Sequence, residues 1–396
     1  MAAPSAHATV PLVEGDDFGL TLGGYARFFS AVQVTAWDSA GLLDRRTGTT
    51  ANVTRGEWRA DLGRRVTVDL HQRVFFRSTT ASSAGLGTSG FGVGVTEPPP
   101  RNVDLSTAFV DDDDLTIEHD IDRLALRIWA DRFDLVLGRQ AITWGTSQVF
   151  PVADVWTAYS PLELDNTEKR GVDAARATVP LGRSELDVVV ADRGDAEDLS
   201  GGVRYVMYLD RSDAWMGAAK LWDELAVMGG FSRDLSTWTL RGDVVWPVWS
   251  LDRDEVLWPR AALGVDWLSP DVILSFEVHA NGEGAGPDDG YIAHATTDPQ
   301  LQRGEVSFLG RYYAAAIGSF ELTELVRFTV SGFANLQDPS GAIAPSLVYQ
   351  VGEATDLSIG AFSPIGEAPN LTPVPSLPSE FGAGSHMLYA QAVAYW

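Results

Sequence analysis

Apolar and polar residues alternate at every second position over most of the chain. The segment EWRADLGRRVTVDLHQRVFF, residues 57–76, shows this pattern twice, on either side of Gly63 and Arg64. In both halves one face of the extended chain is aliphatic or aromatic and the other is charged. Alternation with a period of two is typical of a β-strand with one apolar face. The segment therefore predicts a hairpin, and STWTLRGDVVW, residues 236–246, predicts another strand of the same kind.

The predicted connections fall into two classes that alternate along the chain. The tight turns are expected near 62–64, 130–132, 181–183, 210–212, 233–235, 268–270, 317–319 and 352–354. The variable loops are expected near 37–51, 78–113, 145–168, 194–201, 222–223, 248–255, 281–303, 335–341 and 364–383. Together these connections join about eighteen strands. The alternative is sixteen, if residues 202–222 are not divided at 210–212.

Strict alternation of short turns and long loops, with an even strand number, is typical of a bacterial outer-membrane β-barrel. We therefore expect an all-β fold, a transmembrane antiparallel up-and-down barrel with short periplasmic turns and long extracellular loops. Residues 1–396 are expected to form this single domain, after an N-terminal segment at 1–17. The last strand, MLYAQAVAYW, ends on Trp396 without a polar tail. Pairing of that strand with FGLTLGGYARFFSAVQVTAW, residues 18–37, would close the barrel, because lipid leaves no water for an open sheet edge.

The composition also agrees with an outer-membrane β-barrel. No apolar run approaches the length of a transmembrane helix, and the chain has 13 tryptophans, which accumulate at membrane interfaces. The formal charge of −25 argues against binding nucleic acid, and the absence of cysteine excludes disulfides and thiolate metal sites. The A-x-A pattern at Ala6-His7-Ala8 resembles a signal-peptidase site; either the upstream part of a signal peptide is missing or the match is chance. The expected location is the outer membrane of a Gram-negative bacterium.

The face opposite the apolar phase is predicted to line the lumen, and it is rich in charge. Its arginines are Arg55, Arg59, Arg65, Arg73, Arg77, Arg123, Arg127, Arg176, Arg241, Arg260, Arg311 and Arg327. Its acids include Glu57, Asp61, Asp69, Asp243 and Glu277. Two interpretations stay open: a lattice of ion pairs that stiffens the wall, and a ladder that guides anionic or sugar-like solutes past a constriction.

The loop expected at 145–168 is unusually aromatic, with Trp144, Phe150, Trp156 and Tyr159 in or beside it. Aromatic side chains are poorly placed in free water. We therefore expect the loop to fold inward and narrow the lumen; the alternative is that it caps the rim.

Part of the chain, within residues 138–176, resembles a recurring stretch of porin-like and polysaccharide-export-type outer-membrane barrels. The resemblance is carried by the segments GRQAITWG, FPVADVWT, SP and KRGVDAAR. The resemblance covers about a tenth of the chain and implies a constriction loop held to the wall. The residues it assigns to that loop are Arg139, Gln140, Trp144, Asp154, Trp156, Arg170 and Asp173. Alginate-exporter pores are strongly basic, whereas the loops here are acidic, which argues against an acidic polysaccharide as solute.

The sequence shows no motif typical of catalysis or of metal binding. The chain contains no HExxH or GxSxG motif, so neither a metalloprotease nor an elbow-serine hydrolase is indicated. The acidic run at 110–114 lacks the spaced layout of a calcium loop, and a solvated charge run explains it better; the alternative is divalent bridging to lipopolysaccharide phosphates. We expect no enzymatic activity, no cofactor and no bound metal.

The function that fits best is an outer-membrane channel for passive or facilitated passage of a hydrophilic solute or saccharide. The alternative is a loop-plugged barrel that is a structural or docking component of an envelope or polysaccharide-export complex. A soluble all-β carbohydrate-active enzyme is a third hypothesis. The expected surroundings are outer-membrane lipid and lipopolysaccharide, with periplasmic or envelope proteins as further partners and no nucleic acid.

Overall fold

The computed structural model describes residues 9–15, 17–37, 45–80, 101–157, 168–287, 290–371 and 375–396. The signal-peptidase pattern at residues 6–8 lies outside these ranges, as do parts of the predicted loops at 37–51, 78–113, 145–168, 281–303 and 364–383. Among the described residues, no helix has the length and apolar character needed to cross a membrane.

Regular structure is dominated by strands. The first ten are β1 (Val10–Val13), β2 (Phe18–Val34), β3 (Arg46–Leu62), β4 (Val66–Thr79), β5 (Ser106–Asp111), β6 (Leu115–Trp129), β7 (Asp134–Gln140), β8 (Val172–Pro180), β9 (Ser184–Ala191) and β10 (Ser200–Leu209). The next ten are β11 (Ser212–Leu221), β12 (Glu224–Leu235), β13 (Trp238–Ser250), β14 (Arg260–Leu268), β15 (Val272–Asn281), β16 (Tyr312–Thr323), β17 (Val326–Asn335), β18 (Ser340–Gly352), β19 (Thr355–Ile365) and β20 (His386–Tyr395). Two short helices, α1 (Tyr291–Thr297) and α2 (Pro299–Gln302), and one 3₁₀ turn, Phe381–Ala383, lie in connections.

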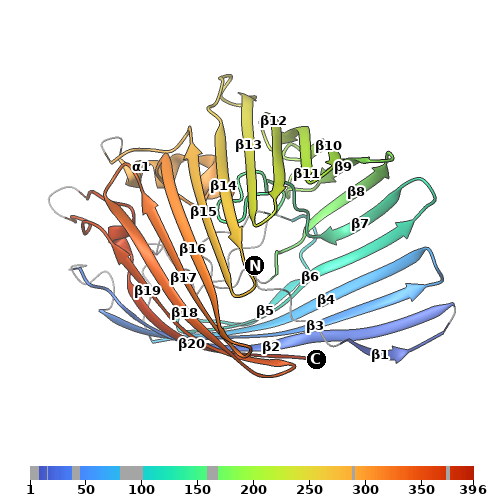
Figure 1. Ribbon diagram of the computed structural model, residues 1–396, viewed down its shortest axis with the longest axis horizontal. Coiled ribbons are helices and arrows are strands. Elements are labelled where there is room, and N and C mark those ends of the chain that lie inside the picture. The colour runs from blue at the N-terminus through green and yellow to red at the C-terminus, as the bar shows by residue number, and fades with distance from the viewer. Residues whose placement is uncertain are drawn as a thin grey trace.

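The strands form a closed antiparallel barrel of eighteen, which confirms the predicted fold class and strand number. Each strand of the ring pairs with its neighbour in sequence, and the ring closes where β20 pairs with β2 from Tyr25↔Tyr395 to Val34↔His386. In Figure 1 the colour runs continuously from blue β2 around the ring to red β20, which lies against β2. The predicted pairing of the last strand with the first is therefore confirmed.

Gly24 and Trp396 exchange two backbone hydrogen bonds, of 2.9 and 3.0 Å, at the end of this seam. Gly24 has φ +155°, and a Cβ there would lie 2.1 Å from the carbonyl oxygen of Arg55 and 3.0 Å from Nε1 of Trp396. Only glycine fits this close approach. The backbone of Trp396 is thereby paired within the barrel.

Two short strands lie beside the ring and were not predicted. β1 pairs with Leu20–Leu22 of β2, beyond the point where β20 ends, so β1 and β20 together cover one edge of β2. β5 pairs with the part of β6 that the short strand β7 leaves uncovered. Both strands satisfy backbone groups that would otherwise form a bare sheet edge.

Most tight turns lie where the alternation placed them, including the division at 210–211 between β10 and β11. The turns predicted at 233–235 and 317–319 are wrong. These residues lie inside β12 and β16, and the chain turns at 236–237 and 324–325. Gly318 resembled a turn residue, but the ring of Phe320 covers it and stacks on Phe328 of β17 at 6.3 Å. Because glycine has no side chain, the neighbouring aromatic ring can lie directly over it within the strand.

The outer surface has the features expected of a wall in lipid. Trp238 and Trp267 pair across β13 and β14 at the short-turn end. Trp246, Trp258 and Tyr312 are exposed at the loop end. Between the two ends, outward side chains are mainly aliphatic, so the surface has an apolar band bordered by aromatic residues.

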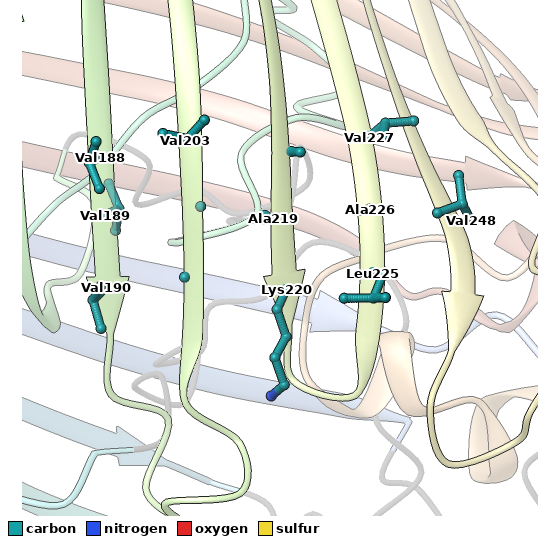
Figure 2. A pocket seen from close by; sticks show the side chains of 13 residues that line it. Val188, Val189, Val190, Val203, Ala219, Lys220, Leu225, Ala226, Val227 and Val248 are labelled. Carbon is teal, nitrogen blue, oxygen red and sulfur yellow. The ribbon is translucent and has the colours of Figure 1, made fainter.

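A shallow apolar groove of about 560 Å³ marks this band on β9 to β13 (Figure 2). Val188, Val203, Leu225 and Val227 line it and are exposed. Lys220, at one end, donates to the carbonyl oxygens of residues 197 and 199, both at 3.0 Å. The groove therefore belongs to the lipid-facing wall rather than to the lumen.

Candidate functional site

The segment 141–157, which follows β7, folds into the barrel. Its apolar side chains, including Ile142, Trp144, Phe150 and Trp156, are almost completely buried. The segment begins earlier than the predicted loop, because β7 ends at Gln140. The described part of this loop therefore folds inward. Residues 158–167 lie outside the described ranges.

Arg139 and Asp173 hold the two ends of the loop together at the tops of β7 and β8. They are direct cross-strand partners, and the guanidinium donates two hydrogen bonds to the carboxylate, at 2.8 and 2.9 Å. Arg139 also donates to the carbonyl of Ile121 at 2.8 Å. Gln140 donates to the carbonyl of Ala174 at 3.1 Å. This bidentate ion pair, with the guanidinium buried, fixes where the chain leaves the wall.

Asp243 on β13 binds the first part of the loop. Its carboxylate accepts the backbone N–H groups of Thr146 and Ser147 at 2.7 and 2.5 Å, and the indole N–H of Trp215 at 3.2 Å. Gly145, with φ +89°, makes the turn that aims these N–H groups, and a Cβ there would lie 2.8 Å from Cβ of Ala153. The left-handed conformation and the lack of space both favour glycine.

Glu277 on β15 binds the next three residues. Its carboxylate accepts the backbone N–H groups of Gln148, Val149 and Phe150 at 3.1, 3.2 and 2.6 Å, and its charge is balanced by Arg241 at 3.1 Å. Hydrogen bonds to a charged acceptor stabilise by about 2 kcal/mol each when they are buried. Glu277 and Asp243 were predicted to line the pore, but both are buried beneath the loop and serve as its anchors.

Phe150 packs the tip of the loop against the wall and against a second inward segment. Its ring stacks on His279 at 5.1 Å and meets Phe308 at 5.7 Å and Tyr313 at 6.2 Å. Phe308 in turn lies 6.2 Å from Phe381. The described parts of the connections 282–311 and 366–385 thus join 141–157 on the β13–β19 side of the lumen.

The remaining motif residues attach the loop to the β8–β10 wall. Trp144 donates its indole N–H to Asp187 at 2.9 Å, and the same carboxylate accepts two hydrogen bonds from Arg176 and one from Arg204. Trp156 meets the ring of Trp144 edge-on at 5.0 Å. Asp187 is fully buried, and four hydrogen bonds from three side chains compensate its lost hydration.

Arg193 and Lys169 complete the attachment. The guanidinium of Arg193 donates to the carbonyls of Val155 and Trp156 at 3.0 and 2.9 Å and stacks over Trp222 at 4.2 Å. Burial lowers the pKa of Arg193 to about 10. Lys169 forms an ion pair with Asp154. Arg170, next to it, is half-buried where the chain returns to the wall.

The opposite wall, on β3, β4 and β6, is charged and more open to the lumen. Nearest the short turns, Arg59 pairs with Asp61 at 3.3 Å and Arg127 pairs with Asp69 at 2.5 Å. The side chains of Arg59 and Arg127 are 51% and 40% exposed. These two arginines therefore stay exposed, whereas the anchors of the loop are buried.

Higher on the same wall the ion pairs are buried. Arg55 binds Asp122 at 2.6 Å and Glu57 at 2.7 Å, and Arg123 lies 3.8 Å from Asp122. In the next layer toward the rim, Asp120 accepts Arg101 at 3.2 Å and lies 3.8 Å from Arg73. Arg77 donates to Thr116 at 3.2 Å. The wall thus combines a buried ion-pair lattice with exposed arginines; guidance of solutes by these arginines stays a prediction.

The other predicted pore residues are divided among several places. Arg65 lies in the β3–β4 turn, outside the strands, and pairs with Asp131 of the neighbouring turn at 2.8 Å. Arg241 and Arg260 are buried, the latter donating to the loop carbonyl of Val152 at 3.3 Å. Arg311 precedes β16 and donates to the carbonyl of Gly284 at 2.5 Å. Arg327 pairs with Glu321 at 3.0 Å.

Sequence reasoning missed several charged residues of the site. Asp120 and Asp122 of β6 were missed because the pairing of β6 with β4 shifts register between His71 and Gln72. Beyond this shift, alternation along β6 no longer identifies the side chains that face inward. Arg204 does follow the alternation of β10 and could have been found from it. Arg193 lies in a connection, where no periodic signal exists.

No protein-family model matches this chain, and no curated protein matches it by sequence. Solved structures do match. Acinetobacter baumannii OccAB2 has a TM-score of 0.61 at 9% identity, covering 97% of this chain and 99% of its own. The outer-membrane protein OpdK of Pseudomonas aeruginosa has a TM-score of 0.58 at 8% identity, with coverages of 95% and 98%. Pseudomonas aeruginosa OprD has a TM-score of 0.52 at 9% identity, with coverages of 94% and 95%.

The chain has the fold of an outer-membrane β-barrel. The likeness extends over nearly the whole of each chain, and it is a likeness of fold. The prediction of an outer-membrane-type barrel is confirmed, and it comes from alternation and loop lengths rather than from sequence identity. Within the part of the chain that is described, no three His, Cys, Asp or Glu side chains are grouped as a metal site would require.

Proposed function

We propose that this barrel is an outer-membrane channel for hydrophilic solutes, formed by residues 1–396 as one domain. The observation that supports the proposal is the unequal filling of the lumen. The β13–β19 side is covered by the segment 141–157 and by the described parts of 282–311 and 366–385, whereas Arg59 and Arg127 on the opposite side remain accessible. A solute would pass along the charged wall, and the inward loop would narrow its path.

The charge of the path supports a small anionic or polar solute. The accessible groups near the short turns are arginines with acids beside them, and guanidinium groups bind carboxylates and phosphates well. Pseudomonas aeruginosa OpdK, whose fold is similar, has been crystallised with vanillate. Vanillate is therefore a reasonable first solute to test here. No covalent chemistry is proposed for the barrel.

The test is electrical. Protein purified in detergent and inserted into a planar bilayer should give discrete current steps, and a salt gradient should give a reversal potential that reports anion or cation preference. Vanillate added to one side should reduce the ion current if it shares the path. Silent bilayers after verified insertion would overturn the channel proposal.

A loop-plugged barrel is the second candidate, and the aromatic contacts among Phe150, Phe308 and Phe381 favour it. Such a barrel would serve an envelope or polysaccharide-export complex as a docking component. It predicts no conductance in the intact protein and conductance only after the inward loop is released.

A further inference from the structure

Two carboxyl groups from separate segments meet in a buried cluster at the loop end of β16 to β18. Asp338 lies in the connection between β17 and β18, and Glu380 lies in the segment 366–385. They are only 2% and 3% exposed. The backbone N–H of Glu380 donates to Asp338 at 2.9 Å, and the amide of Asn335 donates to both carboxylates, at 3.3 and 2.9 Å.

The groups around this pair are neutral hydrogen-bond donors. Glu380 accepts the N–H of Leu309 at 2.7 Å and the hydroxyl of Tyr313, and Asp338 accepts the hydroxyl of Ser340. Tyr291 of α1 reaches the cluster through Asn335, at 3.1 Å. Among the residues with described positions, no arginine, lysine or histidine forms an ion pair with Asp338 or Glu380. The nearby Arg311 directs its guanidinium to the carbonyl of Gly284.

Two negative charges without a cation are costly in a buried site. One proton on the pair removes most of that cost. In agreement, burial raises the pKa of Glu380 to about 7, with the neighbouring Asp338 adding to the shift. Burial and the same carboxylates raise the pKa of Tyr291, so its hydroxyl stays a neutral donor.

We propose that Asp338 and Glu380 form a proton-operated latch. With one proton on the pair, the latch holds the described segments 290–311 and 375–385 onto the ends of β16 to β18. When that proton leaves to solvent, repulsion between the two carboxylates loosens both segments. The inference does not depend on which solute passes, or on whether the barrel conducts at all.

The latch is positioned to affect the inward loop. Phe381, next to Glu380, lies 6.2 Å from Phe308, and Phe308 lies 5.7 Å from Phe150 of the inward loop. Loosening the latch removes the second layer of packing behind Phe150. The hydrogen bonds from Glu277 still hold the loop, so the expected change is local loosening rather than release.

Hydrogen exchange of the full chain in detergent micelles tests the latch at pH 5.5 and pH 8.5. Wild type is compared with Glu380→Gln at the same pH, so that the intrinsic exchange rate cancels. At pH 5.5 the folded pair keeps its proton, so wild type should exchange only modestly faster than Glu380→Gln in 299–311 and 376–385. At pH 8.5 this excess should be at least roughly tenfold larger, because the stability lost through Glu380 grows as the pH rises from the unfolded pKa of the carboxyl through its raised folded pKa.

Glu367→Gln is the matched control, since Glu367 belongs to the same segment but is exposed. It should exchange like wild type at both pH values. Asp338→Asn removes the other charge and should also protect both segments at pH 8.5, which keeps the test valid if Glu380→Gln does not fold. Equal exchange of wild type and the folded carboxyl variants at pH 8.5 would overturn the latch.

Discussion

The carboxylate of Glu277 on β15 accepts the backbone N–H of Phe150 at 2.6 Å, across a sequence separation of 127 residues. Together with Asp243, Glu277 pairs five consecutive N–H groups of the inward loop, from Thr146 to Phe150. A loop without regular structure is thereby fixed to a rigid wall. Its position depends on two acids of the barrel as much as on its own sequence.

Replacing Glu277 by glutamine should loosen the inward loop. The amide offers one acceptor in place of two and leaves Arg241 without one of its two acidic partners, so the expected loss is about 3 kcal/mol or more. Single-channel recordings should show a larger conductance with more current noise. Glu321→Gln is the control, because its exposed pair with Arg327 is worth less than about 1 kcal/mol. An unchanged conductance in Glu277→Gln would contradict the anchoring role.

Adding a methyl group at Gly24 should weaken closure of the barrel. The new Cβ of Gly24→Ala would collide with the Arg55 carbonyl and crowd Trp396, at an expected cost of more than about 2 kcal/mol. The measurement is the fraction of unheated protein that migrates as the folded band on a denaturing gel. Gly352→Ala should leave that fraction unchanged, since nothing lies within 4 Å of its added Cβ. Equal folded fractions in both variants would show that the seam tolerates a side chain.

Removing the accessible arginines should shift ion selectivity toward cations. We expect the double variant Arg59→Gln and Arg127→Gln to move the reversal potential in that direction, because both side chains are open to the lumen. The shift should be larger in 0.1 M than in 1 M salt, since salt screens exposed charges over a length of about 10 Å at 0.1 M. Arg65→Gln removes a charge from a turn instead and should have little effect. Equal shifts in the two variants would argue against a path along β3 and β6.

Replacing Arg193 by lysine should destabilise the loop although the charge is kept. An ammonium group cannot hold the carbonyls of Val155 and Trp156 in the same planar geometry or stack as well on Trp222. The expected loss is about 2 kcal/mol, seen as a lower temperature for loss of the folded gel band. Arg253→Lys, in a partly exposed ion pair, should change that temperature little. A similar change in both variants would mean that charge alone matters at position 193.

Much of the fold could be predicted because lipid imposes a simple rule on strands. Outward residues must be apolar and every backbone group must be paired, so alternation and loop length carry the signal. The rule failed where local geometry departs from it. Gly318 resembled a turn but lies under Phe320, and the register shift opposite His71 and Gln72 hid Asp120 and Asp122.

The candidate site was predictable only in part. The motif around Arg139 and Asp173 marked the ends of the inward loop, because these residues bind each other across neighbouring strands. Glu277 and Asp243 carried no comparable signal. Any inward acid of the wall could have been accessible to the lumen, and only the path of the loop decides which of them it covers.

The sequence by itself indicated about eighteen strands, the inside and outside of most of the wall, and the pairing of the last strand with the first, since these follow from short-range alternation and the need to pair every strand edge. The tertiary structure decided which charges are buried, which arginines stay open, and where Asp338 and Glu380 meet. Those properties depend on the connections after β7, β15 and β19, which fold into the same lumen. Contacts between segments so distant in sequence are fixed by packing and desolvation, which no local pattern records.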